Sequence, residues 1–250
     1  MLLLHKIPRM INSVRNTVLA VANKQNFGYI SPSDFNLYAK QAQLEIFEEY
    51  FYRYTTWMAK QNVKLSGSDY ANIVQNLEEI IDSFSEVSLL TYISENNFEF
   101  PADGYYINTI RYNDIEADRV SNGKILSLLS SNLTAPSYSY PAYILNQNEV
   151  SVYPVPPVGA IPAIVAQYIR HPKDPKWTYI NLSGGEPIFN QSAADYQDFE
   201  LPLSDEPEIV AKILKYVGIS LRDKDVYALA VADDNEEGIK KGGLPIQTTR

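Results

Sequence analysis

The sequence predicts an α+β protein in which a helical bundle, built from N- and C-terminal helices, carries an inserted antiparallel β-rich lobe. The prediction rests on changes of pattern along the chain. Apolar side chains recur at helical spacing up to residue 84, short β-branched and aromatic runs separated by turn residues follow, and helical spacing returns after Pro202. We therefore expect N-terminal helices over 1–87, the β-rich lobe over 88–200, C-terminal helices completing the bundle over 201–237, and an extended tail over 238–250.

Composition places the chain among globular proteins, with 45% hydrophobic and 20% charged residues in 250. The chain has no cysteine, which excludes disulfides, thiolate nucleophiles and cysteine-based metal sites. Its formal net charge is −9, and its basic residues are scattered. Tight nucleic-acid binding needs clustered Lys and Arg, so we expect no such binding. An acidic surface would still be compatible with DNA passing along it, because like charges prevent binding.

The N-terminal helices are predicted from apolar spacing and start signals. A first helix is expected within residues 8–25. Ser31 and Pro32 form a helix start, and the run 35–61 contains no Pro or Gly, which predicts one long helix. A third helix is predicted over 70–84, antiparallel to the second because the connection is short.

The long helix has two apolar stripes. The first stripe predicts a core face, and the second, with a spacing of seven, has two interpretations that the sequence leaves open. It packs inside its own domain, or it packs on a neighbouring subunit, as aromatic-rich surfaces often do. The first stripe is Phe35, Ala39, Ala42, Ile46, Tyr50 and Trp57, and the second is Leu37, Leu44, Phe51 and Met58.

The central segment is predicted to form strands joined by hairpins, in a small sandwich or antiparallel sheet. Turn residues at 101–104 and 154–159 punctuate its β-branched and aromatic runs, and a short helix is expected around 125–131. After it, Asp205 and Glu208 resemble a capping box, the helix that follows is expected to end at Gly218, and a last helix is predicted over 223–237.

No motif of enzyme chemistry is present. The two histidines, His5 and His171, have no metal-ligand spacing, and the Gly123-Lys124 pair lacks the rest of a phosphate-binding loop. Acidic pairs such as Glu48-Glu49 are expected to be solvated charge on helix faces. The sequence therefore predicts a protein that is not an enzyme and binds no cofactor or metal.

The count of 19 tyrosines is the most informative feature of the composition. Tyrosine offers a large contact area with a polar end and is enriched at interfaces. The segment from Tyr138 to Tyr143 is expected to be sheet surface or an interface, and a stacking surface for sugars is the alternative. A short apolar N-terminus, Met1 to Leu4, predicts neither a signal peptide nor a membrane span.

The layout and three segments resemble the head–tail adaptor, or connector ring, proteins of short-tailed bacteriophages, with the closest likeness to ring proteins of crAss-like phages. The segments cover about a fifth of the chain, and no catalytic motif anchors the resemblance. They are Phe35 to Tyr52, Tyr168 to Tyr179 (YIRHPKDPKWTY) and Asp198 to Leu221 (DFELPLSDEPEIVAKILKYVGISL).

The resemblance implies a structural virion protein, assembled in the host cytoplasm, that forms a ring of about twelve copies at the portal and lines the DNA passage. Its partners would be its own copies, the portal protein and other neck and tail proteins. DNA would pass through the lumen without sequence-specific binding, and no membrane would be involved. The β-rich lobe would contact tail proteins, and the tail around Leu244, Pro245 and Ile246 would dock on the portal or a neighbour. The alternative function is a carbohydrate- or receptor-binding module of a larger assembly.

Overall fold

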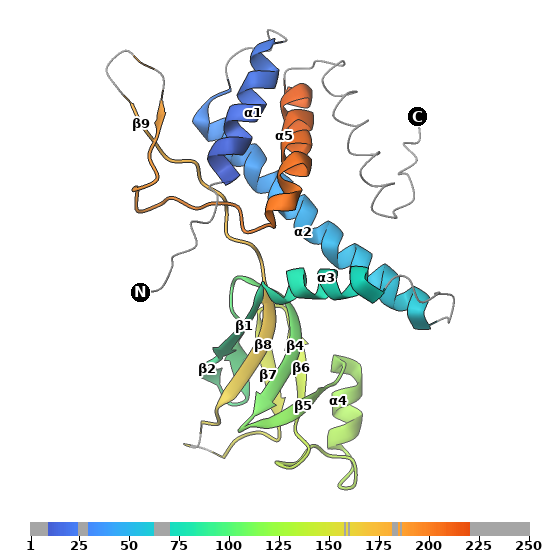
Figure 1. Ribbon diagram of the computed structural model, residues 1–250. Coiled ribbons are helices and arrows are strands. Elements are labelled where there is room, and N and C mark those ends of the chain that lie inside the picture. Colours follow the sequence, from blue (N-terminus) through green and yellow to red (C-terminus); the bar gives the residue numbers. More distant parts are fainter. Residues whose placement is uncertain are drawn as a thin grey trace, which may run out of the picture. The chain divides into compact units, whose positions relative to one another are not determined.

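The computed structural model describes residues 10–24, 30–62, 71–157, 159, 161–181, 185 and 187–220, with the side chains of 24, 57–62, 71–76 and 219–220 outside the description. The chain divides into two compact units (Figure 1). The first unit combines Met1–Ile80 with Pro172–Arg250, and the second unit is Ile81–His171.

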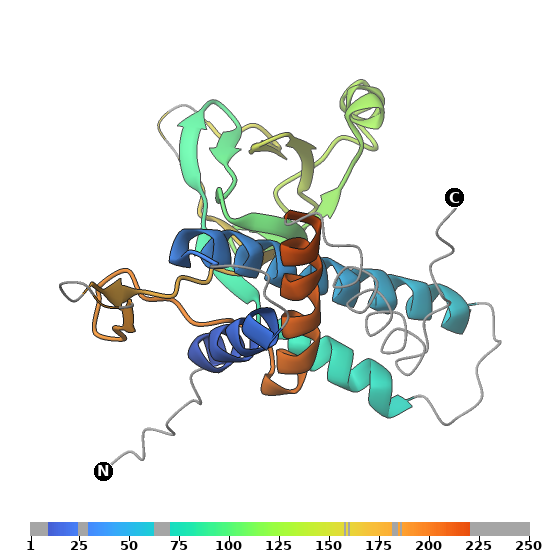
Figure 2. The same cartoon turned by 90° about the horizontal axis from the view of Figure 1, so that it is seen from above.

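The first unit is built on helices, and α5 packs against both α1 and α2 (Figures 1 and 2). The side chain of Ser31 caps α2 by accepting a hydrogen bond from the Asp34 backbone N–H at 3.1 Å, which confirms the predicted helix start. The predicted stop at Gly218 is wrong, because α5 continues to Ser220. The bounds are α1 Met10–Lys24, α2 Pro32–Asn62, α3 Ala71–Asp82, a 3₁₀ turn Leu203–Asp205 and α5 Glu206–Ser220.

The core of this helical layer comes from the apolar positions that repeat at helical spacing. The first stripe of α2 is buried from Phe35 to Tyr50, as its spacing predicts. The side chain of Trp57, the predicted helix 223–237 and the tail 238–250 lie outside the described residues. The other core positions are Ile11, Val14, Val18 and Ala22 of α1 and Ile209, Ile213 and Val217 of α5.

Residues 172–201, which we call the strap, connect to the helices through side-chain hydrogen bonds. Trp177 is only 2% exposed, and its backbone is held by both ends of the Asn36 amide, at 2.8 Å and 3.2 Å. Asp198 accepts hydrogen bonds from the backbone N–H groups of Met10 at 3.1 Å and Ile11 at 2.8 Å. The strap therefore supplies the N-terminal cap of α1 from a residue distant in sequence. It also carries a hairpin, β9 Tyr179–Ile180 and β10 Ile188–Phe189.

The second unit is a sheet of eight strands in the order β1-β8-β4-β5-β6-β7-β3-β2. Only Leu90 separates β1 from β2, so the first and last strands of this order are joined by a single bend and the sheet curls into a half-barrel. The elements are β1 Ser85–Leu89, β2 Thr91–Ser94, β3 Asn97–Glu99, β4 Gly104–Tyr112, β5 Ile115–Arg119, α4 Asn122–Leu129, β6 Ala142–Asn146, β7 Glu149–Tyr153 and β8 Ile164–Arg170.

The predicted fold class is wrong in its architecture. The sheet is mixed, because β5 and β6 pair in parallel with Asp118 opposite Ala142 and Arg119 opposite Tyr143. The short helix α4 links these two strands, and a crossover of this kind returns the chain in the same direction, whereas a hairpin reverses it. The protein is α+β with a large curled sheet that has its own core. It is not a helical bundle carrying an inserted antiparallel lobe.

The concave face of the half-barrel is filled by side chains, as in a small closed barrel. Gly104 is required where the Phe100 ring crosses the start of β4, since a Cβ at this position would lie 2.1 Å from the ring. The Phe100 ring also meets Tyr168 edge-on, with centroids 5.5 Å apart. The buried cluster consists of Leu90, Phe98, Ile107, Ile110, Tyr112, Ala117, Tyr143, Val150, Val152, Ile164, Ala166 and Tyr168.

Candidate functional site

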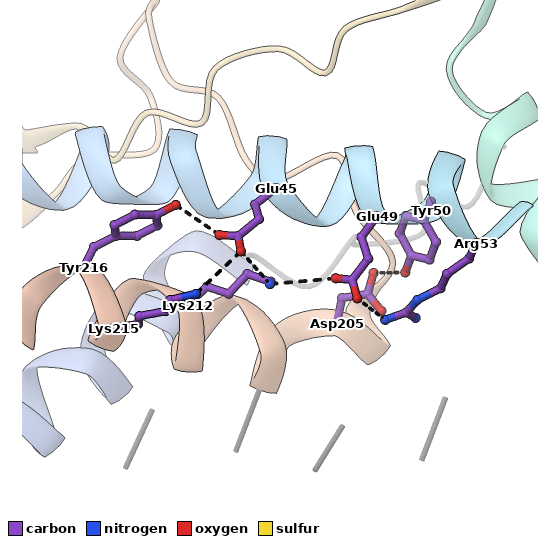
Figure 3. Close-up of polar contacts among 8 residues, drawn as sticks. All are labelled: Glu45, Glu49, Tyr50, Arg53, Asp205, Lys212, Lys215 and Tyr216. Atoms are coloured by element: carbon purple, nitrogen blue, oxygen red, sulfur yellow. Dashed lines mark hydrogen bonds and ion pairs between the residues drawn. The ribbon is translucent and has the colours of Figure 1, made fainter. Parts of the chain in front are cut away.

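A polar network joins α2 to α5 in the first unit (Figure 3). At its centre the Lys212 side chain is 4% exposed, and its Nζ lies 3.2 Å from Glu45 Oε1 and 3.7 Å from Glu49 Oε2. Glu49 also pairs with Arg53 at 2.6 Å, and Tyr216 donates its hydroxyl hydrogen bond to Glu45 at 3.0 Å. The ammonium group is therefore compensated by two carboxylates, as a buried cation requires.

A second buried contact belongs to the same interface. Tyr50 donates a hydrogen bond from its hydroxyl to the carboxylate of Asp205, which is 3% exposed. Burial first, and then the hydrogen bond and negative charge of Asp205, raise the pKa of Tyr50 above its ordinary value. The Tyr50 hydroxyl therefore remains a donor at any ordinary pH, and the contact attaches the 3₁₀ turn before α5 to α2.

The geometry of this network fits a structural role. Its acidic and basic groups are paired with one another, and none of its residues lines either of the two cavities described below. A catalytic group must reach a substrate, and these groups face the opposing helix (Figure 3). The expectation of solvated acidic pairs is wrong for Glu49, which is half-buried and ion-paired, whereas Glu48 is exposed.

Because the pKa of Glu49 is lowered in the folded protein, the stability of the interface between α2 and α5 depends on pH. Burial acts to raise this pKa, but the charge and hydrogen bond of Arg53 and the charge of Lys212 outweigh burial and hold the pKa below its ordinary 4.5. A carboxyl group with a lowered folded-state pKa contributes stability above its unfolded pKa, and this contribution is lost as pH falls through the folded pKa.

We therefore expect the free energy of unfolding to decline as pH is lowered below 4.5, and Glu49→Gln to make this decline shallower. Urea unfolding followed by circular dichroism between neutral and acidic pH measures it. Glu48→Gln is the control, because Glu48 is the exposed neighbour on the same helix. Equal pH slopes for the wild type and Glu49→Gln would contradict the role given to Glu49.

The predicted interface residues fall into different environments. Leu37 is 56% exposed on α2, whereas Leu44 and Phe51 are half-buried. The Phe51 ring packs against Phe47 with centroids 5.0 Å apart. The side chain of Met58 and the whole of Leu244, Pro245 and Ile246 lie outside the described residues. The structure thus leaves Leu37 free to contact a partner and gives Phe51 a contact within its own helix.

The tyrosine segment singled out in the sequence is divided by the structure. Tyr143 is in the half-barrel core at 4% exposure, whereas Tyr138 and Tyr140 are exposed by 51% and 79%. Tyr138 makes a tilted ring contact with Tyr112 at 6.1 Å. The segment therefore does not present one row of stacked tyrosines, because Tyr138 and Tyr140 lie in the connection before β6, whereas Tyr143 lies within that strand.

The cavities in the described part of the chain include two that are large enough for a small ligand. The first, of about 510 Å³, is a shallow and mainly apolar depression beside the start of α5, lined by Thr17, Leu203 and Pro207 among others. The second, of about 370 Å³, is half-open and lies at one mouth of the half-barrel. Its polar lining is Arg119, Gln147 and Asn148, and its aromatic lining is Phe100, Tyr105 and Tyr106.

The sequence contained little signal for this second cavity. Its residues come from β4, β5, β6 and two turns, and no motif connects them. Arg119 lies two positions after the buried Ala117 and so shares its side of β5, which could have placed Arg119 on the concave face once β5 was known. The parallel pairing with β6, which sets Arg119 opposite Tyr143, could not be read from spacing.

The described residues contain no group of three His, Asp or Glu side chains placed to hold a metal ion. None of the helices described is long and apolar enough to cross a membrane. His171 follows β8, donates its backbone hydrogen bond to the Asp103 carbonyl at 2.7 Å and packs edge-on against Tyr105 at 5.0 Å.

Comparison with known proteins yields no assignment. No protein-family model matches the chain. No curated protein matches it significantly.

Proposed function

We propose that this protein is a structural subunit that assembles into a ring at the head–tail junction of a bacteriophage, linking the portal to the tail around the DNA passage. The proposal rests on the resemblance of three segments to connector ring proteins and on one structural observation. That observation is the presence of two separate sets of exposed large apolar side chains in the second unit.

The first set, the β1–β2 face, consists of Val87 and Leu89 of β1 and Ile93 of β2. Val87 and Leu89 are 65% and 64% exposed, and they alternate along β1 so that both point away from the half-barrel core. The second set, the α4 face, consists of Leu126, Leu129 and Leu133.

The α4 face exposes more of its apolar surface. Leu126 is 73% exposed and lies one helical turn from Leu129, and Leu133 in the following turn is 94% exposed. Only Ile125 of α4 is buried. Exposed apolar groups gathered on one element commonly mark a protein contact.

The two faces lie on opposite sides of the second unit. The β1–β2 face lies on the first and last strands of the sheet order, which are joined at Leu90. Helix α4 connects β5 and β6, which lie in the middle of that order. In a curled sheet these positions are diametrically opposed, and Figures 1 and 2 show α4 and β1–β2 on opposite sides of the sheet.

Two different faces on opposite sides suit a head-to-tail contact between copies, which closes into a ring when the rotation per subunit divides a full turn. The occupant of each face is therefore the other face of a second copy. The net charge of −9 is compatible with a lumen that DNA crosses without binding.

We expect Leu126→Gln combined with Leu133→Gln, and separately Val87→Gln combined with Leu89→Gln, to prevent assembly while leaving the fold intact, since all four side chains are exposed. Mass measurement by light scattering and negative-stain electron microscopy reports the assembly. Ile161→Gln is the control, because Ile161 is 62% exposed but belongs to neither face.

Mixing the two double mutants tests the head-to-tail contact specifically. Each retains one intact face, so head-to-tail contact predicts a dimer and nothing larger. No association in the mixture, or rings that persist in either variant, would refute this contact.

Attachment to the portal is tested separately, by electron microscopy of the protein mixed with the portal ring encoded beside it. A rotationally symmetric extra layer is expected, and deletion of residues 238–250 is expected to remove it. Rings that do not bind the portal would contradict the proposed location at the head–tail junction.

A further inference from the structure

We infer that the cavity at the mouth of the half-barrel binds a sugar that carries a carboxylate, held by Arg119, Tyr105, Tyr106 and the amides of Gln147 and Asn148. The inference stands on the cavity alone and does not depend on ring formation. At about 370 Å³ the cavity lies within the size range of small-ligand sites, and the mouth of a curled sheet is a common place for them.

The charge of the cavity selects an anion. Arg119 is its charged lining residue, and no lining side chain is acidic, although the chain as a whole carries −9. Within the described residues Arg119 has no ion pair. Asp103, which stands between the lining residues Ala102 and Gly104 in the sequence, accepts a hydrogen bond from the Tyr168 hydroxyl at 3.3 Å.

The shape of arginine favours a carboxylate. A planar guanidinium binds a carboxylate through two parallel hydrogen bonds, a geometry that a lysine does not offer. Phosphate would meet the same charge, but it would leave the aromatic walls without a partner.

The aromatic and amide walls select a sugar. Tyr105 and Tyr106 are 38% and 51% exposed, so their rings are accessible to the apolar face of a pyranose, and their hydroxyls add polar ends. The amides of Gln147 and Asn148 offer both donors and acceptors, which is what sugar hydroxyl groups require.

The cavity wall is held in place before any ligand arrives. The Phe100 backbone N–H donates to the Asn148 carbonyl at 2.8 Å, and Gly104 donates to the Pro101 carbonyl at 2.9 Å. Gln147 has φ +45° in the turn between β6 and β7, a conformation that the hairpin imposes on this residue. A wall fixed in this way lowers the entropy cost of binding.

The experiment is a titration of the full chain with glucuronate, with glucose and inorganic phosphate as comparison probes, followed by ligand-observed NMR and calorimetry. We expect saturable millimolar binding of glucuronate, at least about tenfold weaker binding of glucose and of phosphate, and a loss of at least about tenfold in Arg119→Gln. Tyr106→Ala is expected to weaken binding, and Tyr106→Phe is expected to retain most of it.

Arg111→Gln is the matched control. Arg111 is also exposed, on the neighbouring strand β4, where it lies opposite Glu116 in the strand register, and it lines neither cavity. Absence of saturable glucuronate binding, equal affinity for glucose or phosphate, or equal losses in Arg119→Gln and Arg111→Gln would each overturn the inference. Circular dichroism of each variant verifies that the fold is retained.

Discussion

Replacing Trp177 by alanine is expected to lower the free energy of unfolding of the first unit by about 4 kcal/mol, within the range for removal of a buried tryptophan. Trp177 is 2% exposed, and its ring stacks against Tyr179 and Phe189, with centroids 5.7 Å and 5.8 Å away. The guanidinium of Arg15 lies 3.8 Å from the ring centroid. Alanine removes all of these contacts and leaves a cavity that the strap cannot close.

The loss also involves a hydrogen bond. The Trp177 indole N–H donates to Asn12 on α1 at 3.1 Å, so the substitution leaves that side-chain acceptor unpaired. Chemical denaturation followed by far-ultraviolet circular dichroism measures the effect, because the first unit contains most of the helix. Trp177→Phe is expected to lose less, since it retains the stacking.

Tyr52→Ala is the control for this prediction. Tyr52 is an aromatic residue of α2 that is 71% exposed, and its removal is expected to change stability by less than about 0.5 kcal/mol. Equal effects of Trp177→Ala and Tyr52→Ala would show that the strap is not an integral part of the first unit.

Replacing Lys212 by alanine is expected to cost about 2 kcal/mol. Breaking a fully buried ion pair costs more, but the side chains of Glu45 and Glu49 are 36% and 33% exposed, so water screens the charges that are left behind. The Lys212 side chain is 4% exposed, and its ammonium contacts both carboxylates and so links them to α5. Denaturant unfolding at neutral pH measures the loss.

Two further variants separate charge from packing. Lys215→Ala is the matched control on the same helix, because Lys215 lies 3.8 Å from Glu45 and its side chain is 24% exposed, so its pair is expected to contribute no more than about 0.5 kcal/mol. Lys212→Met with Glu45→Gln completes a double-mutant cycle that isolates the pair. If Lys212→Ala were no more costly than Lys215→Ala, the network would not hold α5 on α2.

The predictions for Trp177 and Lys212 both depend on contacts with residues far away in the chain. The sequence did not reveal these contacts. The strap consists largely of turn residues, and nothing in its local pattern indicates that Trp177 is the largest fully buried side chain among the described residues. Asp198 caps α1 across a separation of 187 residues, whereas the expected caps are all local.

The lining of the candidate cavity also comes from residues that are far apart in the chain. Arg119, Tyr105 and Gln147 stand on separate strands and turns, and only the curl of the sheet brings them to one mouth. The predicted interface residues of α2 could be proposed from spacing, because Leu37 and Phe51 recur on one side of a helix. The exposed residues of α4 were not predicted, since a short helix with three leucines reads as a core element.

The sequence by itself determined the positions of α1, α2, α3 and α5 and the buried face of α2. Residues from Phe35 to Tyr50 line the core face of α2 because helical periodicity is a local property, repeated every 3.6 residues and readable along the chain. It also determined the start of α2 at Ser31, and it placed the change to strands at residue 88, close to the start of β1 at Ser85. Only the tertiary structure decided the parallel pairing of β5 and β6, the joining of β1 to β2 at Leu90 and the burial of Lys212. Strand order and ion pairing depend on which distant segments meet, and the free energy that selects them comes from packing the whole core rather than from any local pattern.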